Sequence, residues 1–292
     1  SPMAANDVTI IIVTWNVSRL IEACLQSIAG ALGELEGDVI VVDNASADGT
    51  AEIVQRMASR VSGLRVIEPG TNLGFAKANN LAIAQAAGEY LLLLNPDTEL
   101  TPRAIEQLVD CARQHHAAIV GARHRNPDGS LQPSVRQLPT FGVLAMHLLK
   151  LHRLLPNLGS LRRYYARGFA YGRTQPAEQM AGSCLLVSRA ALPRLGTLDE
   201  RFGLWFEEVD LCRRAQAESL PVWYCAQAEV VHHGAASFRQ LDGITRQRQF
   251  NRSLLAYARK HLGVGAWLLL SALHPISLAL AALATVLTRS RP

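Results

Sequence analysis

The hydrophobic positions of this chain fall into short apolar runs separated by longer amphipathic stretches. The runs are rich in Val, Ile and Leu, which predicts strands buried on both faces. They cover residues 8–14, 38–43, 64–68, 89–94 and 117–122. Between them the apolar spacing is that of helices, over residues 19–32, 47–59, 75–86 and 102–114. Strands that alternate with helices in this way predict an α/β fold with a parallel sheet covered on both faces.

Polar side chains follow directly after several of the predicted strands. Asn16, Asp43, Asn44 and Asp97 each lie just past the end of an apolar run, and Pro96 ends the run of leucines before Asp97. The carboxyl ends of parallel strands meet at one edge of a sheet, where ligands bind. The pattern therefore predicts a cleft with Asp97 at its rim, although Asn-Pro-Asp-Thr is equally typical of a simple turn.

The alternation stops at residues 129–177, which hold seven Lys or Arg and no Asp or Glu. Such a block indicates an anionic partner: phosphate, nucleic acid or anionic lipid. Within it, residues 141–156 are basic and amphipathic, which fits a helix on a membrane surface or an ordinary solvated surface helix. Apolar strands and helices then return at residues 181–187, 190–195, 208–218, 222–225 and 247–260.

The last apolar segment, residues 261–288, has no Asp, Glu, Lys or Arg, and basic residues flank it on both sides. It is long enough to cross a bilayer, and Pro275 lies near its middle. We considered a single kinked span, a re-entrant hairpin, two interfacial helices, or a pair of core helices. Apolar residues cover the whole helix circumference, which favours a membrane-associated segment over core helices.

The chain has 292 residues, 49% of them hydrophobic, and a formal net charge of +5. Five cysteines, with no CxxC pair, predict neither a disulfide framework nor a zinc site, and they fit a reducing cytosol. Residues 1–7 are expected to be a tag remnant and a disordered N-terminus, without a signal peptide.

Three groups of side chains could carry chemistry. Asp97 with a histidine and a substrate diphosphate would suit Mg²⁺ or Mn²⁺, and the histidine pair is His232-His233. Glu207 and Glu208 follow two aromatic residues and could supply a general base. Each group also has a structural explanation, since acidic residues at a helix start favour the helix dipole.

Taken in order, these segments form a more specific pattern. The chain resembles the family 2 glycosyltransferases, and within them the rhamnosyltransferase and galactofuranosyltransferase branch. The resemblance covers residues 8–237 and rests on the segments VTWN, VVDNASADGT, NLGFAKANN, LLLLNPDTEL, AGSCLLVSRAAL, LDERFGLWFEEVDLCRR and VVHHGAAS. It implies a GT-A fold, with a nucleotide-binding mixed sheet flanked by helices.

The resemblance also implies site residues. The expected donor-binding residues are Thr14, Asn16, Asp43, Asn44, Asn72, Gly74, Asn79, Asn95 and Asp97. The NPD segment matches the family's DXD motif with asparagine in its first position, so Asp97 would hold the metal, with His232 as a second ligand. The EEVD segment makes Glu208 the expected base. Asp210 is the second expected catalytic residue, with holding the acceptor or orienting Arg213 as its alternative roles. Trp205, Glu207 and Arg213 are the expected acceptor-binding residues.

The resemblance implies an inverting, metal-dependent hexosyltransferase. Its expected donor is dTDP-rhamnose and its expected acceptor a saccharide linked to polyprenyl diphosphate, at the cytoplasmic face of the plasma membrane. A different UDP-sugar donor, a nucleotidyltransferase and an inactive tethered binding protein are the alternatives, and no nucleic-acid partner is expected. The expected division is a catalytic domain over residues 8–260, comprising a nucleotide-sugar half (8–123), a basic insert (124–178) and an acceptor half (179–260). A membrane-associated tail follows over 261–292.

Overall fold

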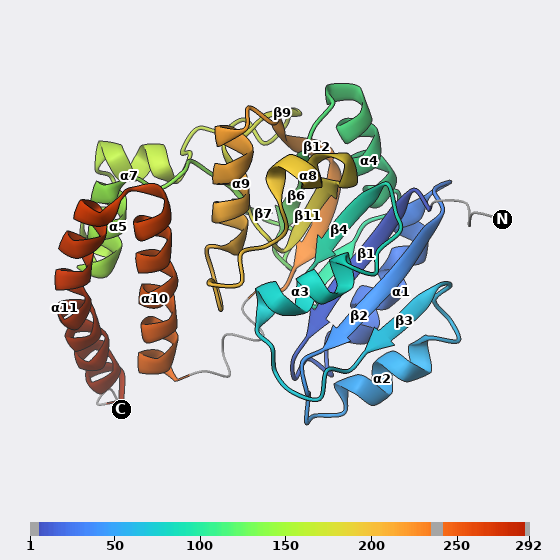
Figure 1. Cartoon of the computed structure of the whole chain (residues 1–292), viewed down its shortest axis with the longest axis horizontal. Helices are drawn as coiled ribbons and strands as arrows, with labels where there is room; N and C mark the ends of the chain where they lie inside the picture. The colour runs from blue at the N-terminus through green and yellow to red at the C-terminus, as the bar shows by residue number, and fades with distance from the viewer. Residues whose placement is uncertain (1–5, 235–241, 290–292) are drawn as a thin grey trace.

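A computed structural model describes residues 6–234 and 242–289 (Figure 1). Within these residues, ten strands form one mixed sheet in the order β3-β2-β1-β4-β11-β6-β12-β5, with β7 beside β6 and β9 beside β12. The strands are β1 (Val8–Thr14), β2 (Gly37–Asp43), β3 (Leu64–Ile67), β4 (Tyr90–Leu94), β5 (Thr98–Leu100), β6 (Ile119–Arg125), β7 (Leu131–Gln132), β9 (Gln175–Pro176), β11 (Cys184–Ser188) and β12 (Val222–His232). The predicted α/β fold is confirmed.

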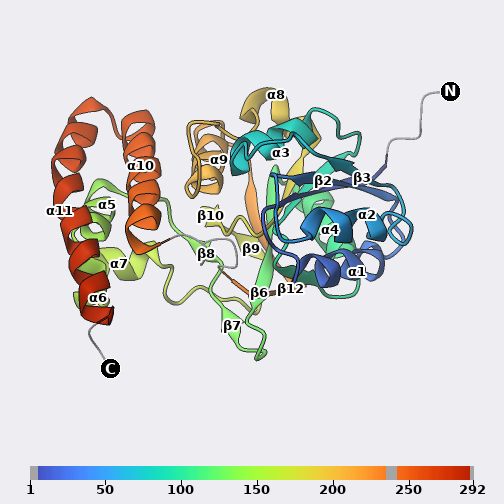
Figure 2. The same cartoon turned by 90° about the horizontal axis from the view of Figure 1, so that it is seen from below.

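The N-terminal half of the sheet has the predicted parallel arrangement, because β1 pairs in parallel with β2 and β4, and β2 with β3. Alternate residues of these strands enter two separate cores on opposite faces of the sheet. Helices α1 (Ile21–Leu32), α2 (Thr50–Met57) and α4 (Ala104–His115) cover one face, and α3 (Phe75–Ile83) and α9 (Glu207–Ala217) cover the other (Figure 2).

The second half of the sheet departs from an all-parallel arrangement. Strand β11 lies antiparallel between β4 and β6, with Cys184 opposite Leu94. The chain reaches β11 after the long basic segment rather than through a strand–helix crossover, so nothing imposes the parallel direction. As a result the start of β11 lies at the carboxyl edge of β4, beside the turn that holds Asp97.

Strand β12 extends well beyond the predicted residues 222–225. Its register with β6 shifts between Cys225 and Glu229. The strand then continues to His232, which pairs with Thr98 of β5. The extension places the histidine segment directly beside the turn after β4. The predicted segment 230–237 is described only to residue 234, since residues 235–241 lie outside the described part.

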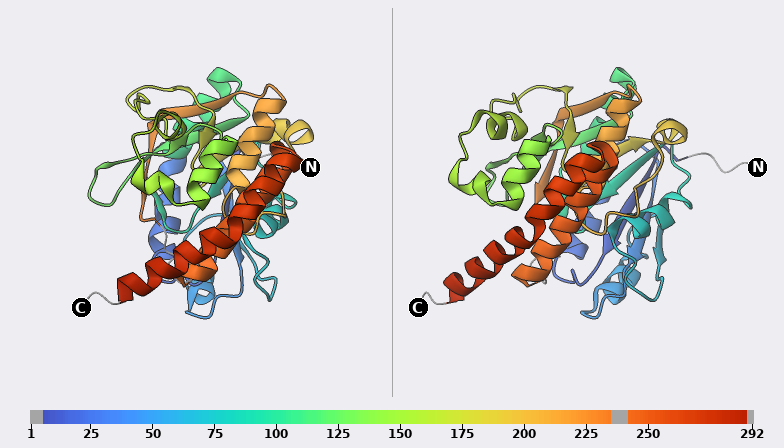
Figure 3. Two further views of the ribbon diagram at one scale, coloured as in Figure 1. Left: turned by 90° about the vertical axis from the view of Figure 1, so that its left-hand side faces the viewer. Right: turned by 60° about the vertical axis from the view of Figure 1, so that its left-hand side comes forward.

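A group of helices lies to one side of the sheet (Figures 1 and 3). It contains α5 (Phe141–Leu148), α6 (Leu151–Leu154), α7 (Gly159–Tyr164), α10 (Gly243–His261) and α11 (Val264–Arg289). The small helix α8 (Leu192–Leu195), the 3₁₀ turn η1 (Arg189–Ala191), and the two-stranded sheet of β8 (Val135–Arg136) and β10 (Gln179–Met180) complete the described elements.

The C-terminal apolar segment is a single helix, α11, that contains Pro275, so the re-entrant hairpin and the two-helix alternatives are wrong. Residues Val264–Ala284 are long and apolar enough to cross a membrane, and only 11% of their apolar window is buried. This low burial does not fit a pair of core helices. At the other end, Asp7 accepts a hydrogen bond from Arg113, while residues 1–5 lie outside the described part.

Candidate active site

Asp97 lies in the tight turn between β4 and β5. The Thr98 amide closes this turn on the Asn95 carbonyl at 3.1 Å, and the Asn95 amide donates to the Ser183 carbonyl at 2.9 Å. The His233 amide donates to the Asp97 carbonyl at 2.9 Å. Neighbouring segments therefore hold the backbone of the turn from two sides. The Asp97 side chain is only 8% exposed, so it lies deeper than the cleft rim predicted for it.

His232 lies next to Asp97, with 3.5 Å between His232 Nε2 and Asp97 Oδ1. On its other side, His232 Nδ1 is 2.8 Å from Gln132 Oε1. An amide oxygen only accepts, so Nδ1 carries a proton, and Nε2 is the ring nitrogen that faces Asp97. Gln132 Nε2 donates in turn to Asn126 Oδ1 at 2.8 Å, which fixes the orientation of the amide. His233 has a different partner, Glu99, at 2.7 Å.

A buried histidine that the motifs did not reveal lies behind this pair. His124 Nε2 is 2.6 Å from Ser183 Oγ, and Nδ1 is 3.0 Å from the Ala122 carbonyl. Burial, with the nearby His232, lowers the pKa of His124 to about 4, so the ring is neutral at physiological pH. The neutral ring donates through Nδ1 to the Ala122 carbonyl, so its Nε2 accepts a hydrogen bond from the Ser183 hydroxyl. His124 therefore orients Ser183, whose carbonyl accepts the hydrogen bond from the Asn95 amide.

The proposed base lies at the start of α9, after two residues in the left-handed region. Trp205 has φ 65° and Phe206 has φ 73°, a conformation that is uncommon for bulky side chains. Helix α10 supports this backbone, because Phe250 packs on Phe206 with ring centroids 5.7 Å apart and Ser253 Oγ donates to the Leu204 carbonyl at 2.8 Å. Strained backbone of this kind is characteristic of functional sites.

Glu207 and Glu208 occupy the first turn of α9. Burial raises the pKa of Glu207, and the adjacent Glu208 raises it further. Burial also raises the pKa of Glu208, while the positive charge of Arg136 opposes that increase. Among the described residues, Glu207 Oε1 is buried without a hydrogen-bond partner. Burial therefore favours the protonated form of Glu207, whereas at Glu208 Arg136 and the helix N-terminus oppose the effect of the same burial.

One cavity of about 430 Å³ brings these groups together. Its lining includes Asn95, Asp97, His232, Trp205, Glu207, Glu208, Arg136, Gly182 and Ser183. A second cavity of about 440 Å³ adjoins it and shares Val13, Phe75 and Leu204 with it. The predicted donor residues Asn44, Asn72 and Gly74 line this second cavity. The structure thus places most of the expected site along one continuous cleft, and the individual roles stay predictions.

Four other expected donor residues line neither cavity; Thr14, Asn16 and Asp43 shape the loop after β2, and Asn79 lies in α3. Asp43 accepts hydrogen bonds from Thr14 Oγ1 at 2.8 Å and from Ser46 Oγ at 2.7 Å. Asn16 Oδ1 accepts from the Ala47 amide, and the buried Asn79 donates to the Phe75 carbonyl. Direct contact of these four predicted side chains with a donor stays a prediction.

Asn44 links the loop after β2 to the second cavity. Its Oδ1 accepts from the Leu73 amide at 3.2 Å, and its Nδ2 donates to the Gly74 carbonyl at 3.3 Å. Gly74 has φ 80°, which glycine adopts without strain. Asn80 of α3, which was not among the expected site residues, donates through Nδ2 to the Leu198 carbonyl at 2.8 Å and accepts at Oδ1 from the Leu198 amide at 3.0 Å.

Asp210 and Arg213 lie away from both cavities. Asp210 is fully buried; it forms ion pairs with Arg214 and Lys260 at 2.8 and 2.6 Å and a hydrogen bond with His261 Nε2 at 2.7 Å. Asp210 pairs with Arg214 and not with Arg213, so the expected role of Asp210 in orienting Arg213 is wrong, although helix geometry allows a partner either three or four residues away. Arg213 instead donates to Gln216. Of the EEVD carboxylates, Glu207 and Glu208 are the ones that line the cavity.

Comparisons with known proteins identify the family of this chain. The sequence model "Glycosyl transferase family 2" matches residues 9–181. The chain belongs to glycosyltransferase family 2. It is 34% identical over 246 residues to an N-acetylglucosaminyl-diphospho-decaprenol L-rhamnosyltransferase of Mycobacterium tuberculosis, covering 78% of this chain and 76% of that protein. A low-salt glycan biosynthesis hexosyltransferase of Haloferax volcanii is 26% identical over 78% of this chain and 67% of its own length.

Among solved structures, a mannosyltransferase from Pyrobaculum calidifontis in complex with GDP-Man and Mn²⁺ has the same fold. The alignment covers all of this chain and 77% of that one, with a TM-score of 0.57 and 21% sequence identity. The predicted family and its GT-A fold are therefore confirmed, and the protein is a hexosyltransferase. Family membership excludes the nucleotidyltransferase alternative.

Proposed function

We propose that this glycosyltransferase transfers L-rhamnose from dTDP-rhamnose to a saccharide carried on polyprenyl diphosphate, in the synthesis of a cell-surface polysaccharide. The rhamnosyltransferase relative supports both the sugar and the lipid-linked acceptor. The observation that carries the proposal is that Asp97, His232 and Glu208 line one cavity, which adjoins the cavity lined by the donor loop.

The residues present fit Mg²⁺ or Mn²⁺. Within residues 6–234 and 242–289, no group of three or more His, Cys, Asp or Glu side chains is arranged to hold a metal. Asp97 and His232 nevertheless supply one carboxylate oxygen and one imidazole nitrogen 3.5 Å apart, and a donor diphosphate would provide further oxygens. When bound there, the ion would neutralise charge on the departing diphosphate.

Glu208 acts as the base in this proposal. Its carboxylate removes the proton from an acceptor hydroxyl, and that oxygen forms a bond to the anomeric carbon of the donor. The bond between the anomeric carbon and the diphosphate oxygen breaks, and its electron pair leaves with the nucleotide diphosphate. Attack from the side opposite the leaving group inverts the anomeric configuration. Asp97 orients the leaving group, and Trp205 and Glu207 contact the acceptor.

A nucleotide-release assay on the full chain with Mn²⁺ and a lipid-linked acceptor tests the proposal, with dTDP-rhamnose compared against UDP-galactofuranose and UDP-GlcNAc. We expect turnover with dTDP-rhamnose. We expect Glu208→Gln to lower kcat by about 10²–10⁴-fold while dTDP binding persists, as for loss of a general base. Glu218→Gln, at the exposed end of α9, is the matched control. Near-normal turnover of the Glu208 variant would remove it as the base, and turnover with a UDP-sugar alone would replace the proposed donor.

The proposed location is the cytoplasmic face of the plasma membrane, with α11 attached peripherally or monotopically. The exposed apolar surface of α11 and the lipid-linked acceptor of the relative support it.

A further inference from the structure

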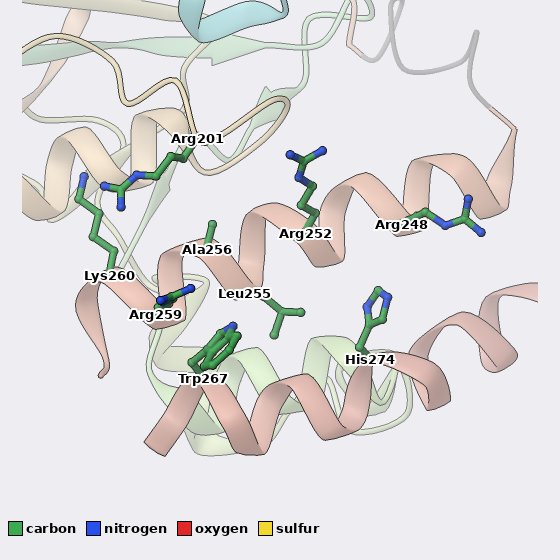
Figure 4. Close-up of a pocket in the computed structure, with 9 residues that line it drawn as sticks. All are labelled: Arg201, Arg248, Arg252, Leu255, Ala256, Arg259, Lys260, Trp267 and His274. Atoms are coloured by element: carbon green, nitrogen blue, oxygen red, sulfur yellow. The ribbon is translucent and has the colours of Figure 1, made fainter. Parts of the chain in front are cut away.

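A groove between α10 and α11 lies outside the cavity that contains Asp97 and Glu208 (Figure 4). Its volume is about 700 Å³, and its lining contains no Asp or Glu. Five basic side chains line it together with Trp267 and three other residues; the basic ones are Arg201, Arg248, Arg252, Arg259 and Lys260. We refer to this feature as the α10–α11 groove.

The basic lining follows from the sequence of α10. Arg248, Arg252 and Arg259 are spaced by four and seven residues, so they lie on one face of the helix. Leu254 and Tyr257, on another face, are fully buried. Helix α10 is therefore amphipathic, with its apolar face toward the protein core and its arginines exposed along the groove.

Two of the five basic groups are already neutralised. Arg201 pairs with Asp199 at 2.5 Å, and Lys260 pairs with Asp199 and Asp210. In the described part of the chain, no carboxylate lies within ion-pair distance of the three α10 arginines. Arg259 lies over the Trp267 ring, 4.9 Å from its centroid. The groove therefore presents uncompensated positive charge that an anionic ligand would complement.

The second wall of the groove continues into an exposed apolar surface. Val264, Leu268 and Leu269 of α11 are 61%, 56% and 63% exposed, and Trp267 lies among them. Large apolar side chains at this exposure mark an interaction surface. A tryptophan beside basic residues is typical of the boundary between lipid headgroups and acyl chains.

We propose that the α10–α11 groove binds the phosphate headgroups of anionic membrane lipids while the exposed apolar residues of α11 enter the acyl region. The arginines supply the charge complement to the phosphates, and Trp267 lies between the charged and the apolar parts. This inference concerns the membrane surface itself. It does not depend on which sugar or acceptor the enzyme uses, so it can fail while the proposed transfer reaction stands.

Flotation of the full chain with vesicles of phosphatidylcholine, with and without phosphatidylglycerol, tests the groove. The variant carries R248Q and R259Q, two residues that line the groove and neither of the two cavities of the active site. The matched control carries R56Q and R60Q, which remove the same charge from exposed positions at and after α2. Equal thermal midpoints of the three proteins verify folding.

Each basic residue near an anionic surface contributes about 1 kcal/mol, so we expect the groove variant to bind phosphatidylglycerol vesicles about thirtyfold more weakly. Binding to phosphatidylcholine alone should not change, and the control should behave like the wild type. Unchanged binding of the groove variant to anionic vesicles would overturn the proposal. An equal loss in the control, or an equal loss on phosphatidylcholine, would do the same, because either result would remove the specific role of the groove.

Discussion

At the scale of single residues, Gln132 determines which nitrogen of His232 faces Asp97. Its Oε1 accepts from His232 Nδ1, while its Nε2 is committed to Asn126 and to the His232 carbonyl. A rotated amide would place an N–H against Nδ1 and would lose the bond to Asn126. Partners of this kind fix the tautomer and the ring orientation of metal-binding histidines. Gln132 is therefore a positioning residue for the proposed metal site.

Replacing Gln132 by methionine should weaken Mn²⁺ binding in the presence of dTDP by about 10–100-fold, the usual effect of losing such a partner. The cause is that Nδ1 loses its acceptor, so the tautomer with its lone pair on Nε2 is no longer favoured. Calorimetric titration of Mn²⁺ measures the change. Gln132→Glu keeps an acceptor oxygen and should restore most of the affinity. Wild-type Mn²⁺ affinity in the methionine variant would show that Gln132 does not position His232.

The contrast between Asp97 and Gln132 shows what the sequence could predict about the site. Asp97, His232 and Glu208 lie in motifs whose residue types are characteristic of the family, and the structure places all three in one cavity. Gln132 lies outside these motifs, and Gly182 lies in the segment AGSCLLVSRAAL without a residue type that indicates its role. A Cβ atom on Gly182 would lie 3.2 Å from Glu208 Cβ, so this glycine leaves room for the proposed base. That requirement comes from a contact between distant segments, which residue spacing does not reveal.

At the scale of elements, the start of α9 combines a strained backbone, a helix N-terminus and two neighbouring carboxylates. The left-handed Trp205-Phe206 pair turns the chain so that the helix begins at Glu207 and both glutamates line the cavity. The sequence predicted the helix and its acidic first turn. It did not predict the left-handed pair, because packing of Phe206 against Phe250 and Tyr257 of α10 holds that conformation.

The pH dependence of kcat/KM should reflect this environment. Burial raises the pKa of Glu208, and a base works only when deprotonated, so activity should be lost as pH falls through that raised value. We expect the midpoint of the acid limb to lie above about 4.3, the ordinary value for glutamate. Glu207→Gln, which resembles protonated Glu207, should keep an acid limb of this kind. A wild-type midpoint at the ordinary value would contradict the assignment of Glu208.

At the scale of the whole molecule, the chain joins a predictable sheet to a less predictable group of helices. The alternation of apolar strands with amphipathic helices in the sequence sufficed to predict the parallel strands of the first half, which the structure arranges as β3-β2-β1-β4. The antiparallel direction of β11 and the length of β12 depend on pairing between segments far apart in the chain, so local patterns missed them. The basic insert and the C-terminal helices pack together beside the sheet (Figure 2). Two segments in this group, α11 and the exposed leucines at the end of α6, are candidates for membrane contact.

These two candidates can be separated by matched substitutions of exposed leucines. Leu268 and Leu269 of α11 are 56% and 63% exposed, and Leu154 and Leu155 of the basic insert are 75% and 50% exposed. Burying one fully exposed leucine contributes about 2 kcal/mol, and these two leucines are a little over half exposed, so L268Q/L269Q should lower partitioning onto phosphatidylcholine vesicles by roughly fiftyfold. L154Q/L155Q should leave it unchanged, because α11 carries the longer apolar surface. If cosedimentation showed the loss only in L154Q/L155Q, the basic insert would be the membrane-binding element and α11 would need another partner.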